Sequence, residues 1–471
     1  MDNNKLLWYE KNIEQYLFDT IYDTDSLIVE MPKERWFKIN PTRGIQSGIS
    51  CYDLVENNCL LSEMLLDVYG ELEFDRKIMD SQVFRFSRRG VAAGGALYPN
   101  IIYILTKKNS KVKIYQYNPA LHLLHYLSIR DANENVFKEN VCYFVITNYY
   151  WRNWFKYRYF GYRLMNVDTG YLLAEFYAVM INRHINGNIY ISDKYFRHMK
   201  NYINNDCGKE SLCAVVTAEN KELLESFEVL EAETSYRLHD DWDTENINLY
   251  RTIEERILNE SFNINEIIGC DKFGKIFETT DWMKNRISPG GAFMQNMYAI
   301  RNEYLFNSLE TLKSMLASIA ELKKDINLFI YVNRISGIKK GLYNIDFNQK
   351  NNLRFIRHID GELQCILKKH NFNLSEIPAL FFISGDTKKY IKKYGISGFK
   401  ILQIKIGFVS HWITLAAAIN NCYTHPILGF DAKTAEKLLQ EDNVLNLIAF
   451  SNAKPIDRFI VKYRRGKRVS K

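Results

Sequence analysis

Residues 144–178 (FVITNYYWRNWFKYRYFGYRLMNVDTGYLLAEFYA) and residues 381–415 (FFISGDTKKYIKKYGISGFKILQIKIGFVSHWITL) align with each other without a gap. Each stretch reads as an apolar strand, a polar turn, a Lys-Tyr pair and a long apolar helix. The two pairs are Lys156-Tyr157 and Lys393-Tyr394. An internal repeat of this kind indicates one architecture built twice, which is the covalent equivalent of a homodimer.

The length and composition predict about two domains with packed cores. The chain has 471 residues, of which 47% are hydrophobic and 14% aromatic, and it contains only 8 Pro. A prior of roughly 150 residues per domain suggests two or three domains, and the repeat favours two. The formal charge of +7 comes partly from a basic C-terminal tail, which is either solvated or binds phosphate or an acidic peptide.

Several classes of protein are not indicated. The eight cysteines are scattered and form no Cys-x-x-Cys or Cys/His cluster, so we expect reduced thiols and no metal site. No phosphate-binding loop, nucleophile elbow or nucleic-acid motif occurs. No apolar signal core and no run of roughly 18 apolar residues is present. We therefore expect a soluble cytoplasmic protein without membrane or nucleic-acid partners.

The sequence pattern divides the chain into four segments. An N-terminal helical and irregular segment, residues 1–75, includes an amphipathic helix at 60–69. A first copy spans residues 76–225, an acidic helical linker spans 226–280, and a second copy spans 281–471.

Strands and helices follow one another in both copies. The expected strands are 101–105, 112–117, 141–147 and 212–217 in the first copy and 328–332, 341–345, 379–384 and 444–451 in the second. A helix is expected at 304–322. The long helices that contain YLLAEFYAVMI and FVSHWITLAAAI are apolar nearly all round, which predicts burial on every side. The pattern is typical of an α+β fold with a central helical seam.

Two motifs of the first copy occur in a characteristic order. Residues 85–99 (RFSRRGVAAGGALYP) carry a Gly-Gly turn directly before a strand, and residues 151–170 (WRNWFKYRYFGYRLMNVDTG) carry the first Lys-Tyr pair. Together they resemble the nitroreductase-like flavoproteins, and most closely their SagB-type dehydrogenase branch. The resemblance covers about residues 50–217 and, more weakly, residues 285–471.

The resemblance implies a fold, an activity and partners. The fold would be α+β, with two fused nitroreductase-like domains forming an intramolecular pseudo-dimer. The activity would be FMN-dependent oxidation of thiazoline or oxazoline rings to thiazoles or oxazoles in a ribosomally made peptide, with dioxygen reoxidising the flavin. The implied partners are an azoline-containing precursor peptide and the cyclodehydratase that forms its azolines. A further homodimer stays open.

The resemblance also assigns roles to residues of the first copy. The turn Ala93, Gly94, Gly95 and Ala96 would approach the flavin ring, since backbone without side chains can aim N–H groups at its polar edge. Lys156 would be the base, because an aromatic, partly desolvated pocket favours neutral lysine, and Tyr157 would position the ring or relay the proton. Taken alone, the first motif fits an ordinary turn better and the second fits a solvated Lys beside a packing Tyr better, so the assignment depends on the two motifs occurring together.

The second copy departs from the family pattern. It has no Gly-Gly turn before its strand 328–332, and a polar run precedes Lys393-Tyr394, so we expect that pair to be structural. Other residues resemble the family's flavin ligands, namely Arg286 and Ser288 for phosphate, Gly429 and Phe430 for the ring edge, and Lys462 and Arg464 for phosphate. We therefore expect one composite site with its phosphate bound by the second copy.

Three alternatives remain open. Arg286 and the basic tail would be plain surface charge if they bind no phosphate. The enzyme would be a nitroreductase or quinone reductase if NAD(P)H supplies the electrons. The chain would be a flavin-free scaffold of a peptide-modifying complex if neither copy binds the cofactor, and its acidic linker would suit docking of a partner.

Overall fold

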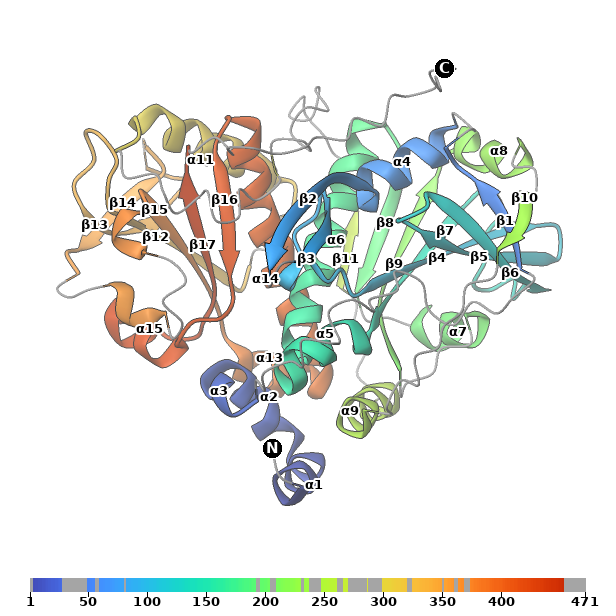
Figure 1. The fold of residues 1–471 in the computed structure, drawn as a ribbon, viewed down its shortest axis with the longest axis horizontal. Coiled ribbons are helices and arrows are strands. Elements are labelled where there is room, and N and C mark those ends of the chain that lie inside the picture. Colours follow the sequence, from blue (N-terminus) through green and yellow to red (C-terminus); the bar gives the residue numbers. More distant parts are fainter. Residues whose placement is uncertain are drawn as a thin grey trace. The chain divides into compact units, whose positions relative to one another are not determined.

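A computed structural model describes residues 3–27, 49–55, 59–79, 82–191, 195–203, 209–229, 233–236, 247–260, 266–269, 286, 299–319, 324–349, 351–359, 363–367 and 373–452 (Figure 1). The chain divides into two compact units. The first-copy unit comprises Val29–Lys272 with Phe459–Lys471, and the second-copy unit comprises Met1–Ile28 with Phe273–Arg458. The N-terminal helices α1 (Asn3–Lys11), α2 (Ile13–Tyr22) and α3 (Thr24–Leu27) thus group with the second copy.

The first-copy unit is built on a nine-stranded antiparallel sheet, in the order β10-β1-β6-β5-β4-β7-β9-β8-β11. Its strands are β1 (Ile49–Asp53), β4 (Asn100–Lys108), β5 (Lys111–Asn118), β6 (Leu123–Asp131), β7 (Cys142–Tyr149), β8 (Asn186–Ile191), β9 (Glu210–Glu219), β10 (Glu233–Tyr236) and β11 (Glu266–Gly269). The four expected strands correspond to β4, β5, β7 and β9. By contrast, β10 and β11 fall in the segment that was expected to be a helical linker.

Side chains of β7 alternate between two layers of helix, as the two-residue period of a strand requires. Tyr143 and Val145 share a core cluster with Met199 of α7 (Tyr195–Tyr202). Phe144 faces the other way, and its ring lies 5.3 Å from that of Phe176 in α6 (Gly161–Asn182). Helices α4 (Leu60–Tyr69) and α8 (Lys221–Val229) pack together in the same unit.

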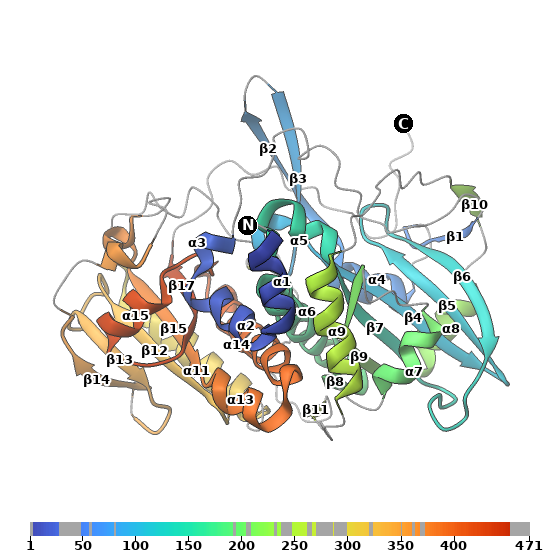
Figure 2. The same cartoon turned by 90° about the horizontal axis from the view of Figure 1, so that it is seen from below.

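A separate two-stranded ribbon, β2 (Glu71–Met79) with β3 (Gln82–Arg89), leads into the glycine turn. Figure 2 shows this ribbon extending away from the nine-stranded sheet. Helix α9 (Asn248–Asn259) completes the described helices of the first-copy unit together with α5 (Tyr150–Tyr157).

The second-copy unit contains a six-stranded antiparallel sheet in the order β14-β13-β12-β15-β17-β16. Its strands are β12 (Ile326–Val332), β13 (Gly341–Ile345), β14 (Leu353–Arg357), β15 (Ala379–Gly385), β16 (Tyr423–Ile427) and β17 (Val444–Ser451), and its main helices are α11 (Asn302–Ala317), α13 (Thr387–Tyr394), α14 (Ile396–Ile419) and α15 (Ala432–Leu439). This order repeats β6-β5-β4-β7-β9-β8 strand for strand. The two units therefore share one topology.

The long helix of each copy is buried, as its sequence predicts. Residues 161–181 of α6 and 396–418 of α14 are all buried. Among the described residues, α14 is the one helix long and apolar enough by composition to cross a membrane, but it is buried inside the protein. A helix in the core of a protein can be equally long and apolar, so this feature is weak evidence for a membrane span.

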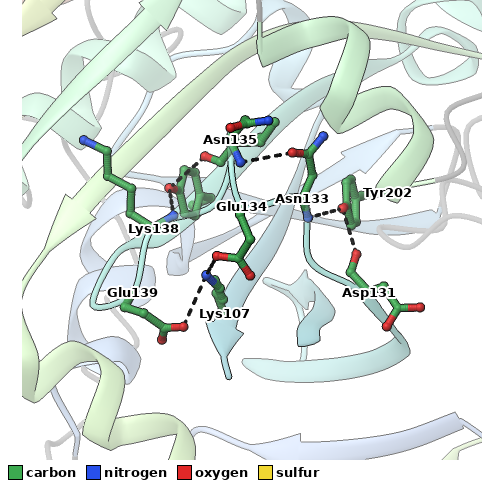
Figure 3. A network of polar contacts seen from close by, with 10 residues as sticks. Lys107, Asp131, Asn133, Glu134, Asn135, Lys138, Glu139 and Tyr202 are labelled. Atoms are coloured by element: carbon green, nitrogen blue, oxygen red, sulfur yellow. Dashed lines mark hydrogen bonds and ion pairs between the residues drawn. The ribbon is translucent and has the colours of Figure 1, made fainter. Parts of the chain in front are cut away.

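A polar network holds the connection between β6 and β7 (Figure 3). Lys107 of β4 forms ion pairs with Glu134 and, at 3.3 Å, with Glu139. The Tyr202 hydroxyl accepts the N–H of Asn133 at 3.0 Å and donates to the carbonyl of Asp131 at 2.8 Å. The loop is thus tied to β4 on one side and to α7 on the other.

Candidate active site

Lys156 and Tyr157 lie at the C-terminal end of α5, immediately before a sharp break in the chain. Arg158 has φ 46° and ψ −131°, and a short turn then leads into α6. Both side chains of the pair are half-buried, and the Lys156 Nζ lies 5.1 Å from the centre of the Tyr157 ring. The sequence predicted this pair before a long helix, and the structure adds a separate helix that ends with it.

The glycine turn lies directly against this pair. Gly95 has φ 62°, in the left-handed region that favours glycine. A β-carbon at Gly95 would lie 2.5 Å from Lys156 Nζ and 2.6 Å from the Tyr157 hydroxyl. Gly95 itself is exposed, and Ala93, Gly94 and Ala96 are half-buried. The structure thus brings together the two motifs that the sequence singled out in the first copy.

A buried carboxyl group supports the turn from behind. Asp168 on α6 is 1% exposed and accepts the Gly94 N–H at 3.0 Å and 3.2 Å from its two oxygens. Burial raises the pKa of Asp168 to about 8, while the Gly94 N–H and the Asn153 side chain act in the opposite direction. This carboxyl therefore holds its proton to a higher pH than an exposed aspartate does.

The Tyr157 hydroxyl keeps its proton near neutral pH. Burial is the main cause that raises the pKa of Tyr157 far above its ordinary value, and the charge of Asp168 adds to it. This hydroxyl can therefore donate a hydrogen bond to a bound molecule at the turn. Removal of its proton would need a stronger base or a bound cation.

Two buried arginines fix the end of the turn. The Arg152 Nη1 donates to the carbonyl of Tyr98 at 2.6 Å. The Arg89 guanidinium lies against the rings of both Tyr69 and Tyr98, 4.2 Å and 4.3 Å from their centres, and pairs with Glu71 at 3.8 Å. Such stacked and paired arginines hold the strand that follows the turn in one orientation.

The aromatic run around the pair is partly core. Tyr150 and Trp154 are buried, and the Tyr250 hydroxyl donates to the carbonyl of Arg158 at 2.8 Å. Tyr250 belongs to α9, so a helix from the expected linker packs on the break after the pair. The run therefore stabilises α5 from inside the unit, and among its described side chains the half-buried Trp151 and Tyr159 are placed to contact a ligand.

The equivalent positions of the second copy hold a different chemistry. Lys405 aligns with Asp168, and Tyr390 aligns with Asn153. The Lys405 Nζ donates to the Tyr390 hydroxyl at 3.0 Å, and that hydroxyl donates to Asp325 at 3.2 Å. Because β12 pairs with β15 as β4 pairs with β7, Asp325 stands where the first copy has Pro99, directly after its turn.

The second Lys-Tyr pair keeps the local geometry of the first. The Lys393 Nζ lies 4.4 Å from the centre of the Tyr394 ring. Gly395 breaks the chain with φ 60° and ψ −150°, much as Arg158 does. The pair is therefore repeated, whereas the groups beside it are not.

The remaining sequence-predicted ligands lie in the second-copy unit or outside the described residues. Arg286 is buried, and the pKa of His411 is lowered by burial and by the charge of Arg286. Phe430 is buried, and nothing lies within 4 Å of a β-carbon built at Gly429, between β16 and α15. Ser288, Lys462 and Arg464 lie outside the part of the chain that the structure describes.

Asp168 lies within the motif of residues 151–170, but the sequence alone predicts no role for it. Its role depends on contact with Gly94, which lies 74 residues away along the chain. The available signal was a charged residue on a mostly apolar helix, because such a residue is seldom buried without a specific partner. Among the described residues, no cluster suits a metal ion.

Comparison with solved structures defines the class of fold. A crystal structure from Anabaena variabilis, provisionally assigned as a nitroreductase, superposes with a TM-score of 0.70 and 17% identity over 94% of this chain and 99% of that one. The chain therefore has a nitroreductase-like mixed helix and sheet fold.

A second solved structure is more distant. The E. coli microcin synthetase McbBCD complex with truncated pro-MccB17 bound gives a TM-score of 0.27 and 16% identity, over 41% of this chain and 74% of that one. This superposition is too poor to support a structural argument. No protein-family model and no curated protein sequence matches the chain.

Proposed function

We propose that this chain is an FMN-dependent dehydrogenase that oxidises thiazoline or oxazoline rings in a ribosomally made peptide. One observation carries the proposal. The Lys156 Nζ and the Tyr157 hydroxyl converge on the exposed Gly95 backbone, so a candidate base, a proton donor and a glycine turn lie together. The nitroreductase-like fold supports a flavin oxidoreductase in general, and the motif resemblance supports the azoline substrate.

The residues of the turn suit a flat aromatic cofactor. Gly95 is exposed and presents backbone without a side chain, while the Lys156 Nζ and the Tyr157 hydroxyl occupy the space that a side chain there would fill. Asp168 fixes the N–H of Gly94. Bound FMN would supply the acceptor for the hydride that leaves the azoline ring. Arg286, Ser288, Lys462 and Arg464 as phosphate ligands, and Gly429 and Phe430 at the ring edge, stay predictions.

The chain's own groups would handle the proton. Conversion of an azoline to an azole removes a hydride from one ring atom and a proton from its neighbour. Lys156 in its neutral form would take that proton, since its Nζ stands at the turn where the peptide ring would lie. Tyr157 would orient the ring by donating a hydrogen bond, because its hydroxyl stays protonated near neutral pH.

The proposal includes partners and a compartment. The substrate is a precursor peptide whose azolines are formed by a cyclodehydratase, so we propose that this enzyme works in a complex with it. We also propose a cytoplasmic location. Dioxygen as the final electron acceptor balances the overall reaction, in which an azoline and dioxygen give an azole and hydrogen peroxide.

A nitroreductase or quinone reductase fed by NAD(P)H is the second candidate. The superposition on a provisionally assigned nitroreductase favours it. The two candidates differ in their electron flow, because azoline oxidation turns over in air without a nicotinamide. Turnover that requires NAD(P)H would favour the second candidate.

The direct test compares Lys156→Ala with Lys393→Ala, its counterpart in the second copy. Flavin content and azole formation are measured on the full chain with a cyclodehydratase-treated peptide. We expect Lys156→Ala to retain flavin and to lose azole formation by roughly a hundredfold or more, as removal of a general base does. Lys393→Ala is expected to retain both. Unchanged activity in Lys156→Ala would remove this residue from the mechanism.

A further inference from the structure

The outer edge of β6 in the first copy is covered by an additional strand. β1 pairs antiparallel with β6 through Cys51 with His125, Tyr52 with Leu124 and Asp53 with Leu123. β10 then pairs with β1. The Tyr52 ring packs edge-on to Tyr115 of β5, with ring centres 5.7 Å apart. This edge of the repeated sheet can thus accept an antiparallel strand that carries an aromatic side chain.

β14 is the counterpart of β6 in the second copy. Tyr115 pairs with Tyr126 in the first copy, and Tyr343 pairs with Phe355 in the second. The register shifts beside each pair, directly before Tyr115 in β5 and directly before Tyr343 in β13. The two ring pairs have similar geometry, with centres 5.7 Å and 5.2 Å apart. By this register Leu353 corresponds to Leu124, and Arg354 corresponds to His125.

The edge of β14 is exposed in the part of the chain that the structure describes. β14 is the last strand of its sheet there. Phe355 is 40% exposed and Ile356 is 38% exposed. An edge strand with open backbone groups and apolar side chains is a template for strand addition.

Basic side chains surround this edge. Arg354 is exposed on β14, and Lys339 and Lys340 are exposed on the turn before β13. The Lys339 Nζ lies 4.9 Å from the centre of the Phe355 ring. The acids close to these cations are Asp346 near Arg354 and Glu441 near Arg357. Among the described residues, the four cations Lys339, Lys340, Arg354 and Arg357 thus outnumber the two acids that interact with them, which favours an acidic partner.

We propose that the β14 edge binds an extended acidic peptide segment that adds to the sheet as an antiparallel strand at Leu353 and Arg354. An aromatic side chain of that segment would pack on Tyr343, as Tyr52 packs on Tyr115. A second copy of this chain is a poorer occupant, because two β14 strands would bring their arginines together. The proposal does not depend on the flavin site.

The test uses the full-length protein and a fluorescein-labelled peptide, DISSYDD. Its sequence is based on residues 49–53 with Ser in place of Cys51 and with added acids. Fluorescence anisotropy gives the affinity, and hydrogen–deuterium exchange gives the location. We expect binding that weakens with salt, with new protection of the amides of residues 353–357. The peptide DIPSYDD has the same charge but a proline that removes one backbone donor, and it is expected to bind much more weakly.

Two charge-reversed variants distinguish binding at the β14 edge from nonspecific electrostatic attraction to the protein. Arg354→Glu is expected to weaken binding of DISSYDD roughly fivefold or more, as reversal of one close surface charge does. Lys388→Glu reverses an exposed charge on α13 of the same unit and is expected to leave the affinity unchanged. Flavin absorbance is expected to be the same in both variants.

Four outcomes would overturn the proposal. They are absence of binding by DISSYDD, equal binding of DIPSYDD, equal weakening by the two charge reversals, and protection that falls outside residues 353–357. Analytical sedimentation of the protein without peptide tests whether a second copy of the chain binds this edge instead. A concentration-dependent dimer with β14 protected would assign this edge to a second copy of the chain.

Discussion

Gly95 shapes the candidate active site because it has no side chain. Its left-handed φ of 62° costs an alanine about 1 kcal/mol, and a methyl group would collide with Lys156 Nζ and the Tyr157 hydroxyl. We therefore expect Gly95→Ala to destabilise the fold by about that amount and to lower azole formation by about a hundredfold, because small misplacements of reacting groups are costly. Denaturant unfolding and an activity assay measure the two effects.

Gly429→Ala is the matched control for that substitution. A β-carbon at Gly429 meets nothing within 4 Å, so stability is expected to change little. Its effect on flavin content tests the prediction that this loop lies at the ring edge. A Gly95→Ala protein with normal activity would show that the turn does not position the Lys-Tyr pair.

Asp168 makes stability depend on pH. Burial raises its pKa in the folded protein to about 8, whereas the unfolded chain has the ordinary low value. As pH rises from about 4 to about 8, the unfolded chain loses this proton while the folded protein retains it, so this carboxyl lowers the free energy of unfolding. Asp168→Asn is expected to flatten that decline and to raise stability at alkaline pH. Urea unfolding at several pH values checks it, and an unchanged slope would contradict it.

For single residues, the sequence predicted which motifs form the site but not the buried side chains that support those motifs. Ala93–Ala96 and Lys156-Tyr157 could be recognised because glycines and a Lys-Tyr pair form compact motifs. Asp168 and Arg152 act through contacts with residues that are distant in sequence, and a single sequence carries no direct signal for such contacts.

At the scale of elements, the break after each Lys-Tyr pair has a different residue in the two copies. Arg158 and Gly395 occupy nearly the same backbone conformation, which is strained for any residue with a β-carbon. Arg158→Gly relieves this strain but removes the contact of Arg158 with the Trp154 ring. The net effect is expected to be a rise of about 1 kcal/mol in the free energy of unfolding. Gly395→Ala is expected to lower it by about 1–3 kcal/mol. Denaturant unfolding measures both, and a loss of stability in Arg158→Gly would contradict the strain.

The elements with strong apolar patterns could be predicted, whereas two short strands in an acidic region could not. The helix at Leu60–Tyr69 and the strands Gly341–Ile345 and Val444–Ser451 have the expected bounds, because their apolar patterns are strong. β10 and β11 have four residues each, lie in an acidic region and are defined by pairing with β1 and β8. Their strand state is a tertiary effect that local propensity does not encode.

At the scale of the whole molecule, one architecture occurs twice with unequal chemistry. Both units repeat the order of strands and the break after Lys-Tyr, but Asp168 is replaced by Lys405 and joined to Tyr390 and Asp325. A lysine that is hydrogen-bonded to a tyrosine stands where the first copy has a buried carboxyl group behind a glycine turn. We therefore expect one active centre per chain, with its glycine turn and catalytic pair in the first copy.

The most direct measurement is the amount of flavin bound by the purified full-length protein. We predict one FMN per chain, measured by visible absorbance against protein concentration and identified after release by denaturation. Gly95→Ala is expected to bind less FMN, and Lys393→Ala is expected to bind the same amount. A colourless protein that takes up no FMN, or one that binds two per chain, would contradict a single flavin centre built on the first copy.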